Sequence, residues 1–253
     1  TVIWYTAMFS ALGFLKGAMR VESTMAEIII GASAALGMAF FVIFGALSDR
    51  IGRKKPIVWG YALTLVLLFP AFWIMGQSAN PDLVRTNMAV PVQVEGAGCR
   101  YSPFAEEQAT PCASLLGDLT GLGVTYTVVP GDALKLRIGE RGITLDTQPT
   151  TAAPERKARL KGWLEDAGYS FETVRPGAWD AIRIGAMLLL LMALSGATYG
   201  PVAALLAEMF PPQIRYSSMS IPYHIGTGYF GGFLPLISSY MVASSGNPYQ
   251  GLW

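Results

Sequence analysis

The stretch that decides the fold reads Gly45-Ala46-Leu47-Ser48-Asp49-Arg50-Ile51-Gly52-Arg53-Lys54-Lys55, and it lies between two long apolar runs. Residues 25–47 carry one charge, Glu27, and residues 57–76 carry none. At ~1.5 Å per residue, each run is long enough to cross a hydrocarbon layer of ~30 Å. We therefore predict two membrane-spanning helices joined by a short turn. The turn holds four cations, and the positive-inside rule places such a turn in the cytoplasm.

The composition is that of a membrane protein. Hydrophobic residues make up 52% of the 253 residues, charged residues make up 14%, and the mean hydropathy is +0.41. In a typical soluble domain, about a quarter of the residues are charged. The formal net charge of +1 provides no basic surface, so we expect no nucleic-acid partner.

Two further runs are long enough to span a bilayer. Residues 184–207 are free of charge, and residues 216–243 contain His224 as their only titratable group other than tyrosine. Residues 1–21 are also apolar, but Lys16 and Arg20 interrupt them. We expect a partial span there, in a chain that is a fragment.

The spans divide the chain into three regions. Residues 1–77 hold the partial span and two whole spans, and residues 179–253 hold two more. With the Asp49 turn inside, alternation of the spans places the block at 78–178 outside the cytoplasm. The sequence thus predicts a multi-pass protein of the plasma (inner) membrane with a periplasmic or extracellular insert.

The block at 78–178 has the composition of a small water-soluble domain, with many charges, prolines and glycines. Alternation of apolar and polar residues predicts a hairpin at 134–145 around Gly139-Glu140-Arg141-Gly142, and a strand at 124–129. Proline start signals predict one helix from Pro154 to Gly168 and a second, short helix after Pro111. The insert is therefore expected to be α+β.

Cys99 and Cys112 are the only two cysteines, and both lie in this block. An extracytoplasmic compartment is oxidising, so a disulfide between them would persist. A bridge closing a loop of this size contributes ~3 kcal/mol in the chain-entropy model. The alternative is two buried free thiols.

Asp49 and Arg53 are the charges of the turn that topology does not explain. Lys54 and Lys55 are accounted for as solvated anchors that keep the loop inside. An acid in a basic cytoplasmic loop contributes nothing to that orientation, so we favour a working role for Asp49 and Arg53. The alternative for both is a solvated surface charge.

Three motifs carry a family resemblance. The turn, G-x-L-S-D-R-x-G-R-K-K, resembles the signature loop of the major facilitator superfamily of secondary transporters, in the copy between its eighth and ninth helices. Glu208-Met209-Phe210-Pro211-Pro212-Gln213-Ile214-Arg215 resembles the E-x-F-P-x-x-x-R loop before the eleventh helix. These loops and residues 216–226 together resemble the metabolite:proton symporter branch.

The resemblance implies an all-α membrane protein, the second half of a twelve-helix bundle, with a small α+β extracytoplasmic insert that is not general to the family. It implies a gate in which Asp49 docks on a helix N-terminus of the missing N-terminal half. Arg53 would pair with an acid, for which Glu208 is the candidate. Arg50 and Arg215 complete the expected gating set.

Polar groups within the spans suggest a substrate cavity, because polar tips are costly in lipid unless they face water or protein. In the family, the helices that carry them line the central cavity. His224 is the only titratable nitrogen within a span, and histidine changes charge near neutral pH. Interface packing of the aromatic rings is the alternative. The candidates are Trp4, Tyr5, Tyr199, Tyr223 and His224.

The resulting hypothesis is proton-coupled secondary transport of a small polar metabolite, either an organic acid, an osmolyte or a sugar, by alternating access. Its rival is a membrane-anchored sensor or binding protein that acts through residues 78–178. Gly226-x-Gly228-x-x-Gly231 matches a dinucleotide fingerprint, but it lies in an apolar run without a preceding strand. Because no zinc or serine-hydrolase motif is present, we expect no enzyme activity, no metal site and no cofactor. The expected partners are the substrate, protons and lipid.

Overall fold

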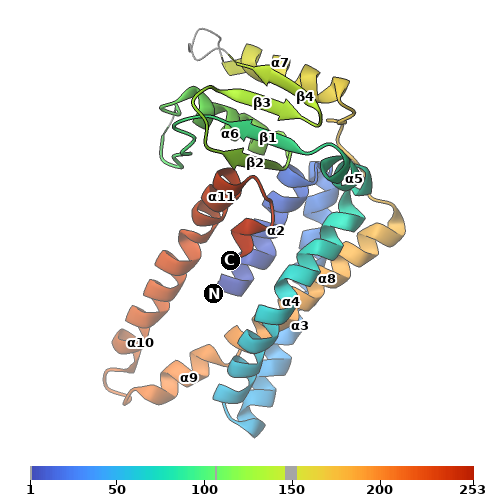
Figure 1. Cartoon of the computed structure of the whole chain (residues 1–253). Coiled ribbons are helices and arrows are strands. Elements are labelled where there is room, and N and C mark those ends of the chain that lie inside the picture. Colours follow the sequence, from blue (N-terminus) through green and yellow to red (C-terminus); the bar gives the residue numbers. More distant parts are fainter. Residues whose placement is uncertain (1, 106, 146–152) are drawn as a thin grey trace.

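The chain forms a group of long helices with an α/β lobe at one end (Figure 1). The structure, a computed structural model, describes residues 2–105, 107–145 and 153–253. Three helical stretches are long and apolar enough to span a membrane: α3 (Ser23–Ile51), α4 (Lys54–Ala79), and α8 (Ala178–Tyr199) continued by α9 (Val202–Met209). They correspond to the predicted spans 25–47, 57–76 and 184–207. The prediction of a mostly helical protein with helices of membrane-spanning length and composition is confirmed.

Helix α8 lies between α3 and α4 and packs closely on both. Glycines make this approach possible, since hydrophobicity does not drive helices together in lipid and small residues let backbones come close. A Cβ at Gly196 of α8 would lie 2.9 Å from the carbonyl carbon of Phe40 on α3. A Cβ at Gly60 of α4 would lie 2.6 Å from a methyl carbon of Thr198 on α8.

The first helical segment is short and irregular. It consists of α1 (Val2–Tyr5), the π-helix η1 (Thr6–Ser10), α2 (Ala11–Gly13) and the π-helix η2 (Phe14–Ala18). It ends at Arg20, which has a left-handed φ of 58°. The segment is shorter than a full span, as the predicted partial span at 1–21 implied.

The segment predicted as one span at 216–243 has a different form. It is a broken rod made of α10 (Arg215–His224), the π-helix η3 (Ile225–Gly231) and α11 (Leu234–Ser245). It is not among the three stretches that are long and apolar enough to span a membrane. The span at 216–243 therefore stays a prediction, and the π-helix falls where glycines at 226, 228 and 231 weaken the α-helical bonding pattern. A 3₁₀ turn, η4 (Gln250–Leu252), follows.

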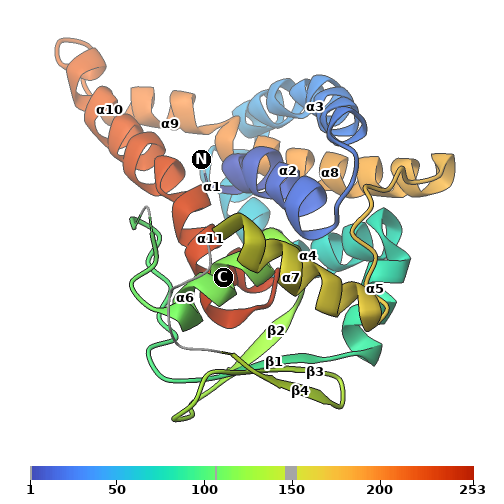
Figure 2. The same cartoon turned by 90° about the horizontal axis from the view of Figure 1, so that it is seen from above.

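The lobe has two layers. Its strands are β1 (Val92–Glu95), β2 (Tyr126–Val129), β3 (Lys135–Ile138) and β4 (Arg141–Thr144), in the order β2-β1-β3-β4. Strands β1 and β2 are parallel, and the other neighbours are antiparallel. Helices α6 (Pro111–Gly121) and α7 (Ala153–Asp166) pack on one face of the sheet (Figure 2), and α5 (Pro81–Ala89) connects α4 to β1.

The buried face of the sheet shows the alternation that the sequence predicted. Val94 and Leu136 are fully buried on neighbouring strands, whereas Arg137 and Glu95 lie on the other face. The expected hairpin, the strand at 124–129 and both expected lobe helices are present. The hairpin turn is tighter than expected, because residues 141 and 142 already belong to β4.

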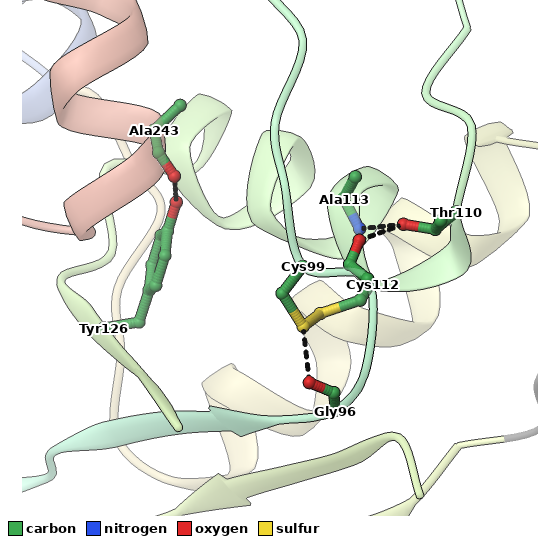
Figure 3. The surroundings of a disulfide bond; sticks show 8 residues. Gly96, Cys99, Thr110, Cys112, Ala113, Tyr126 and Ala243 are labelled. Atoms are coloured by element: carbon green, nitrogen blue, oxygen red, sulfur yellow. Dashed lines mark hydrogen bonds between the residues drawn. A yellow bond between two sulfur atoms is a disulfide. The ribbon is translucent and has the colours of Figure 1, made fainter. Parts of the chain in front are cut away.

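Cys99 and Cys112 form a disulfide with a Cα–Cα distance of 4.9 Å, as predicted (Figure 3). Cys112 lies in the first turn of α6, where Thr110 caps the helix by accepting a bond from the amide of Ala113 at 3.2 Å. The Thr110 hydroxyl also donates to the carbonyl of Gly98 at 2.6 Å. The bridge therefore ties the chain after β1 to the start of α6.

Candidate functional site

Arg53 is held by two carboxylates at the end of the molecule that is far from the lobe. Its Nε donates to Glu208 Oε1 at 2.9 Å, and its Nη1 forms an ion pair with Asp49 Oδ1. The Nη1 atom also donates to the hydroxyl of Ser48 at 2.8 Å. The guanidinium thus joins the turn between α3 and α4 to the last turn of α9.

Local backbone structure places these groups. Asp49 lies in the last turn of α3, so the i, i+4 spacing brings its carboxylate to Arg53 across the turn. Gly52 makes the turn possible with a φ of 94°, which side chains disfavour. Glu208 reaches Arg53 because α9 bends away from α8 at Gly200-Pro201, where proline cannot continue the bonding ladder.

The exposure of the two carboxylates in this cluster favours ion pairs that can break and form again. The side chain of Arg53 is 20% exposed, whereas those of Asp49 and Glu208 are 61% and 55% exposed. Hydrogen bonds to Glu208 and then to Asp49 raise the pKa of Arg53 above its usual value, so the guanidinium stays charged. Exposed ion pairs contribute little to stability, so water can replace either carboxylate at little cost.

Arg50 and Arg215, the other predicted gating residues, lie near this cluster in sequence but not in its ion pairs. Arg50 is exposed at the end of α3. The Nε of Arg215 donates to the carbonyl oxygen of Phe210 at 3.2 Å, which closes the loop between α9 and α10. The gating role of both stays a prediction.

Tyr199 and Tyr223 meet, although 24 residues separate them in the sequence. Their hydroxyl oxygens are 2.5 Å apart, and the ring of Phe41 lies edge-on to Tyr199 with centroids 6.3 Å apart. His224 is exposed, and its ring packs edge-on against Tyr223 at 5.5 Å. This forms a polar aromatic cluster between α8 and α10.

Trp4 and Tyr5 lie on α1, which packs against both α8 and η3. Their rings contact each other at 5.4 Å, and Phe9 contacts both. Trp4 also packs against the hydrophobic core of the helices. Part of its surface therefore has a packing role, which was the alternative to a place in a substrate cavity. The structure places four of the five predicted cavity residues in two aromatic pairs and adds His224 beside the second pair.

Several residues of these clusters carry no distinctive signal in the sequence. Ser48 is buried and donates to Gly45 O at 2.6 Å while it accepts from Arg53, but a serine inside a helix carries no distinctive signal. Phe41 was one apolar residue among many in a span. Only the packing of α3 on α8 brings it to Tyr199.

A cavity of about 200 Å³ lies between the first helical segment and α11, on the lobe side. Hydroxyl groups of Ser10, Ser238 and Ser239 lie among aromatic and aliphatic side chains in its wall. Thr120 of α6 also lines it, so the lobe covers part of the cavity. Such a wall suits a small molecule with both polar and apolar parts.

Comparison with known proteins gives consistent results. Residues 2–97 match a protein family described as the LacY proton/sugar symporter. The Escherichia coli K12 inner membrane metabolite transport protein YhjE is 34% identical over 77 residues, which are 30% of this chain and 18% of that protein. A protein of Haemophilus influenzae named as a metabolite transport protein is 38% identical over 65 residues, or 26% of this chain and 15% of that protein.

The chain spans less than a fifth of the length of the curated relatives that it matches. No solved structure matches it. The matched family segment contains the whole Asp49 turn with Arg53. The comparisons therefore show that the chain is similar, over residues that include this turn, to a family of proton/sugar symporters, and that it is similar to metabolite transport proteins.

Proposed function

We propose that this chain is part of a proton-coupled secondary transporter that moves a small polar metabolite by alternating access. The observation that carries the proposal is the bridge of Arg53 to Asp49 and Glu208. A membrane anchor needs no exposed ion pairs between distant helices, whereas a gate needs contacts that can form and break. The side of the molecule far from the lobe is the proposed cytoplasmic side.

The polar aromatic cluster supplies a proposed substrate site. Hydroxyls of Tyr199 and Tyr223 offer donors and acceptors for hydroxyl or carboxyl groups of a substrate, and the rings of Trp4 and Tyr5 offer apolar faces. His224 is proposed to handle a proton, because imidazole binds and releases one near neutral pH. The proton/sugar symporter description of the matched family supports coupling to protons and keeps a sugar among the candidate substrates, with organic acids and osmolytes.

The remaining parts of the proposal concern topology and partners. We propose an inner-membrane location, which the printed name of the Escherichia coli relative supports. The lobe would lie in the periplasm or outside the cell, and an N-terminal half of the same protein would complete the bundle. These proposals follow from the cations of the Asp49 turn and from the position of the lobe at the opposite end of the molecule.

Uptake by vesicles that contain the full-length protein tests the proposal. Radiolabelled sugars, organic acids and osmolytes are offered with and without an imposed proton gradient. Uptake of at least one class that rises with the gradient is the expected result. If no class is taken up while the lobe binds one of them, the rival reading of a membrane-anchored binding protein replaces ours.

A further inference from the structure

The lobe is hydrogen-bonded to the end of α11 through one tyrosine. The hydroxyl of Tyr126 on β2 donates to the carbonyl oxygen of Ala243 at 2.5 Å (Figure 3), and its backbone amide donates to the carbonyl of Gly246 at 3.1 Å. Both acceptors belong to the C-terminal end of α11, where carbonyl groups lack partners inside the helix. Tyr126 is 4% exposed, so these bonds are shielded from water.

Two glycines show how close this contact is. Gly246 has a φ of 71°, and a Cβ there would overlap the carbonyl oxygen and the ring of Tyr126. Gly123, just before β2, has a φ of 70°, and a Cβ there would lie 2.8 Å from the carbonyl oxygen of Ala18. The lobe therefore touches both the end of the first helical segment and the end of α11 backbone to backbone.

The contact with the first segment is the more heavily bonded of the two. Arg20 donates to the carbonyl oxygens of Leu122 at 2.9 Å and Phe171 at 2.5 Å, and its guanidinium lies 4.9 Å from the ring centre of Phe171. Main-chain bonds between Val174 and both Arg20 and Glu22 add to this. We regard it as the fixed side of the lobe.

The contact of the lobe with α11 has fewer hydrogen bonds than its contact with the first segment. The rod of residues 215–245 stands apart from the group formed by α3, α4 and α8 (Figure 1), and α11 packs most closely on η1, α6, β2 and η4. Its π-helix and the glycines at 226, 228 and 231 make it a segment that bends readily. The lobe is thus a principal support of the rod at this end.

Tyr126 is also hydrogen-bonded to Thr120, a residue of the lobe that lines the cavity. The hydroxyls of Tyr126 and Thr120 are 2.8 Å apart, and Thr120 lines the cavity between the first helical segment and α11. Ser238 of α11 also lines this cavity. A movement of α11 away from Tyr126 would therefore separate Ser238 from Thr120.

We propose that Tyr126 and Gly246 form a latch that holds the cavity closed on the lobe side, and that release of the latch from α11 opens the cavity. The latch would regulate access to the transport pathway, and in this respect the inference rests on the proposed function. Tyr126 acts as a positioning residue, because it holds α11 and Thr120 and touches no substrate.

Two substitutions in the full-length protein test the latch. Tyr126→Phe removes the hydroxyl bonds to Ala243 and Thr120, and Gly246→Ala pushes α11 from the tyrosine. Hydrogen exchange of the Tyr126 amide should accelerate by about five- to tenfold in either variant, since that amide bonds to α11. Gly168→Ala is the matched control, because Gly168 has a φ of 98° but nothing within 4 Å of a new Cβ.

A second readout follows the cavity itself. A cysteine replacing Ser238 should react several-fold faster with a membrane-impermeant thiol reagent in both latch variants than in the wild-type or Gly168→Ala background. Equal exchange and equal labelling in all four backgrounds would overturn the latch. Both readouts are independent of uptake, so a protein that transports none of the substrates offered would refute the proposed function and leave the latch result standing.

Discussion

At the scale of single residues, the proposed gate depends on one guanidinium shared by three side chains. Arg53 reaches Glu208 through Nε and both Asp49 and Ser48 through Nη1 of its planar guanidinium. Lysine, a point charge on a flexible stem, could not hold the same set together. The cluster therefore requires arginine at this position and not merely a positive charge.

Removing the bridge should reduce transport without affecting membrane insertion. We expect Arg53→Ala and Asp49→Asn each to lower the uptake rate roughly tenfold or more, because a gate that cannot close does not complete the cycle. Lys55→Ala, at an exposed cation of the same turn, is the matched control and should transport normally. The double variant Arg53→Ala/Glu208→Gln should cost less than the sum of its parts, since the two residues share one interaction. Normal uptake by both single variants would remove the gate.

His224 should affect proton or substrate handling. We expect His224→Ala to raise the apparent KM of uptake or to shift its pH profile, because the exposed imidazole lies against Tyr223 in the proposed site. Tyr229→Phe, at an exposed residue of η3, serves as the control. An unchanged KM together with an unchanged pH profile would leave His224 as a packing residue.

At the scale of elements, the helices depend on close glycine contacts and the lobe on its disulfide and buried tyrosines. Gly196 allows α8 to touch α3, and Tyr169 donates to the carbonyl of Val90 at 2.7 Å in the lobe. Both are contacts between elements that no single helix or strand would show. Each gives a prediction for stability.

A methyl group at Gly196 should loosen the packing of α8 on α3. We expect Gly196→Ala to lower the free energy of unfolding by about 1–3 kcal/mol, because the new Cβ would overlap Phe40 and force the helices apart. Gly31→Ala on α3 has nothing within 4 Å and should leave stability unchanged or slightly raised. Thermal unfolding in detergent measures both. Equal midpoints for the two variants would contradict this view of the packing.

The lobe should lose stability at high pH. Burial raises the pKa of Tyr126 and of Tyr169 to about 12, from about 10 in the unfolded chain. Because the folded pKa is the higher one, this contribution to stability is complete below pH ~10 and is lost as pH rises from ~10 to ~12. Hydrogen exchange of lobe peptides should be steady from pH 6 to 9 after correction for intrinsic rates, then rise. The Tyr126→Phe/Tyr169→Phe variant should show a weaker dependence.

At the scale of the whole molecule, the helices separate two regions of different chemistry. The Asp49 turn and Glu208 lie at one end, and the lobe with its disulfide lies at the other (Figure 1). In the proposed orientation, the proposed ion-pair gate and the proposed latch would lie on opposite faces of a membrane. Alternating access requires one closure on each side.

Labelling of intact cells tests that orientation. A membrane-impermeant thiol reagent should label neither Cys99 nor Cys112 before reduction, and both after mild external reduction and denaturation. A cysteine replacing the exposed Lys55 should stay protected throughout, because we place it in the cytoplasm. Labelling at position 55 with protection of the lobe would invert the orientation.

The amino-acid sequence by itself determined the features that depend on local composition and spacing. The length and apolar character of residues 25–47, 57–76 and 184–207 were sufficient to predict three spans, since a hydrocarbon layer sets the length of a helix that crosses it. Alternation and proline signals predicted β2, β3, β4, α6 and α7 but neither β1 nor α5, and two cysteines in one block predicted the disulfide. The Asp49 turn and the Glu208 loop were sufficient to indicate the transporter relatives.

Other contacts between distant groups depend on the tertiary structure. The family resemblance implied that Glu208 pairs with Arg53, whereas the contact of Tyr223 with Tyr199 was not predicted. Both contacts form because α9 bends at Gly200-Pro201 and the rod that follows runs back toward the lobe. The division of that rod into α10, η3 and α11 escaped an argument based on hydropathy, since apolar length does not distinguish α- from π-helical bonding. Tyr126 carried no signal as a strand residue. Its role appeared only when its hydroxyl lay on the end of α11, because contacts between elements far apart in sequence are set by packing and not by local residue patterns.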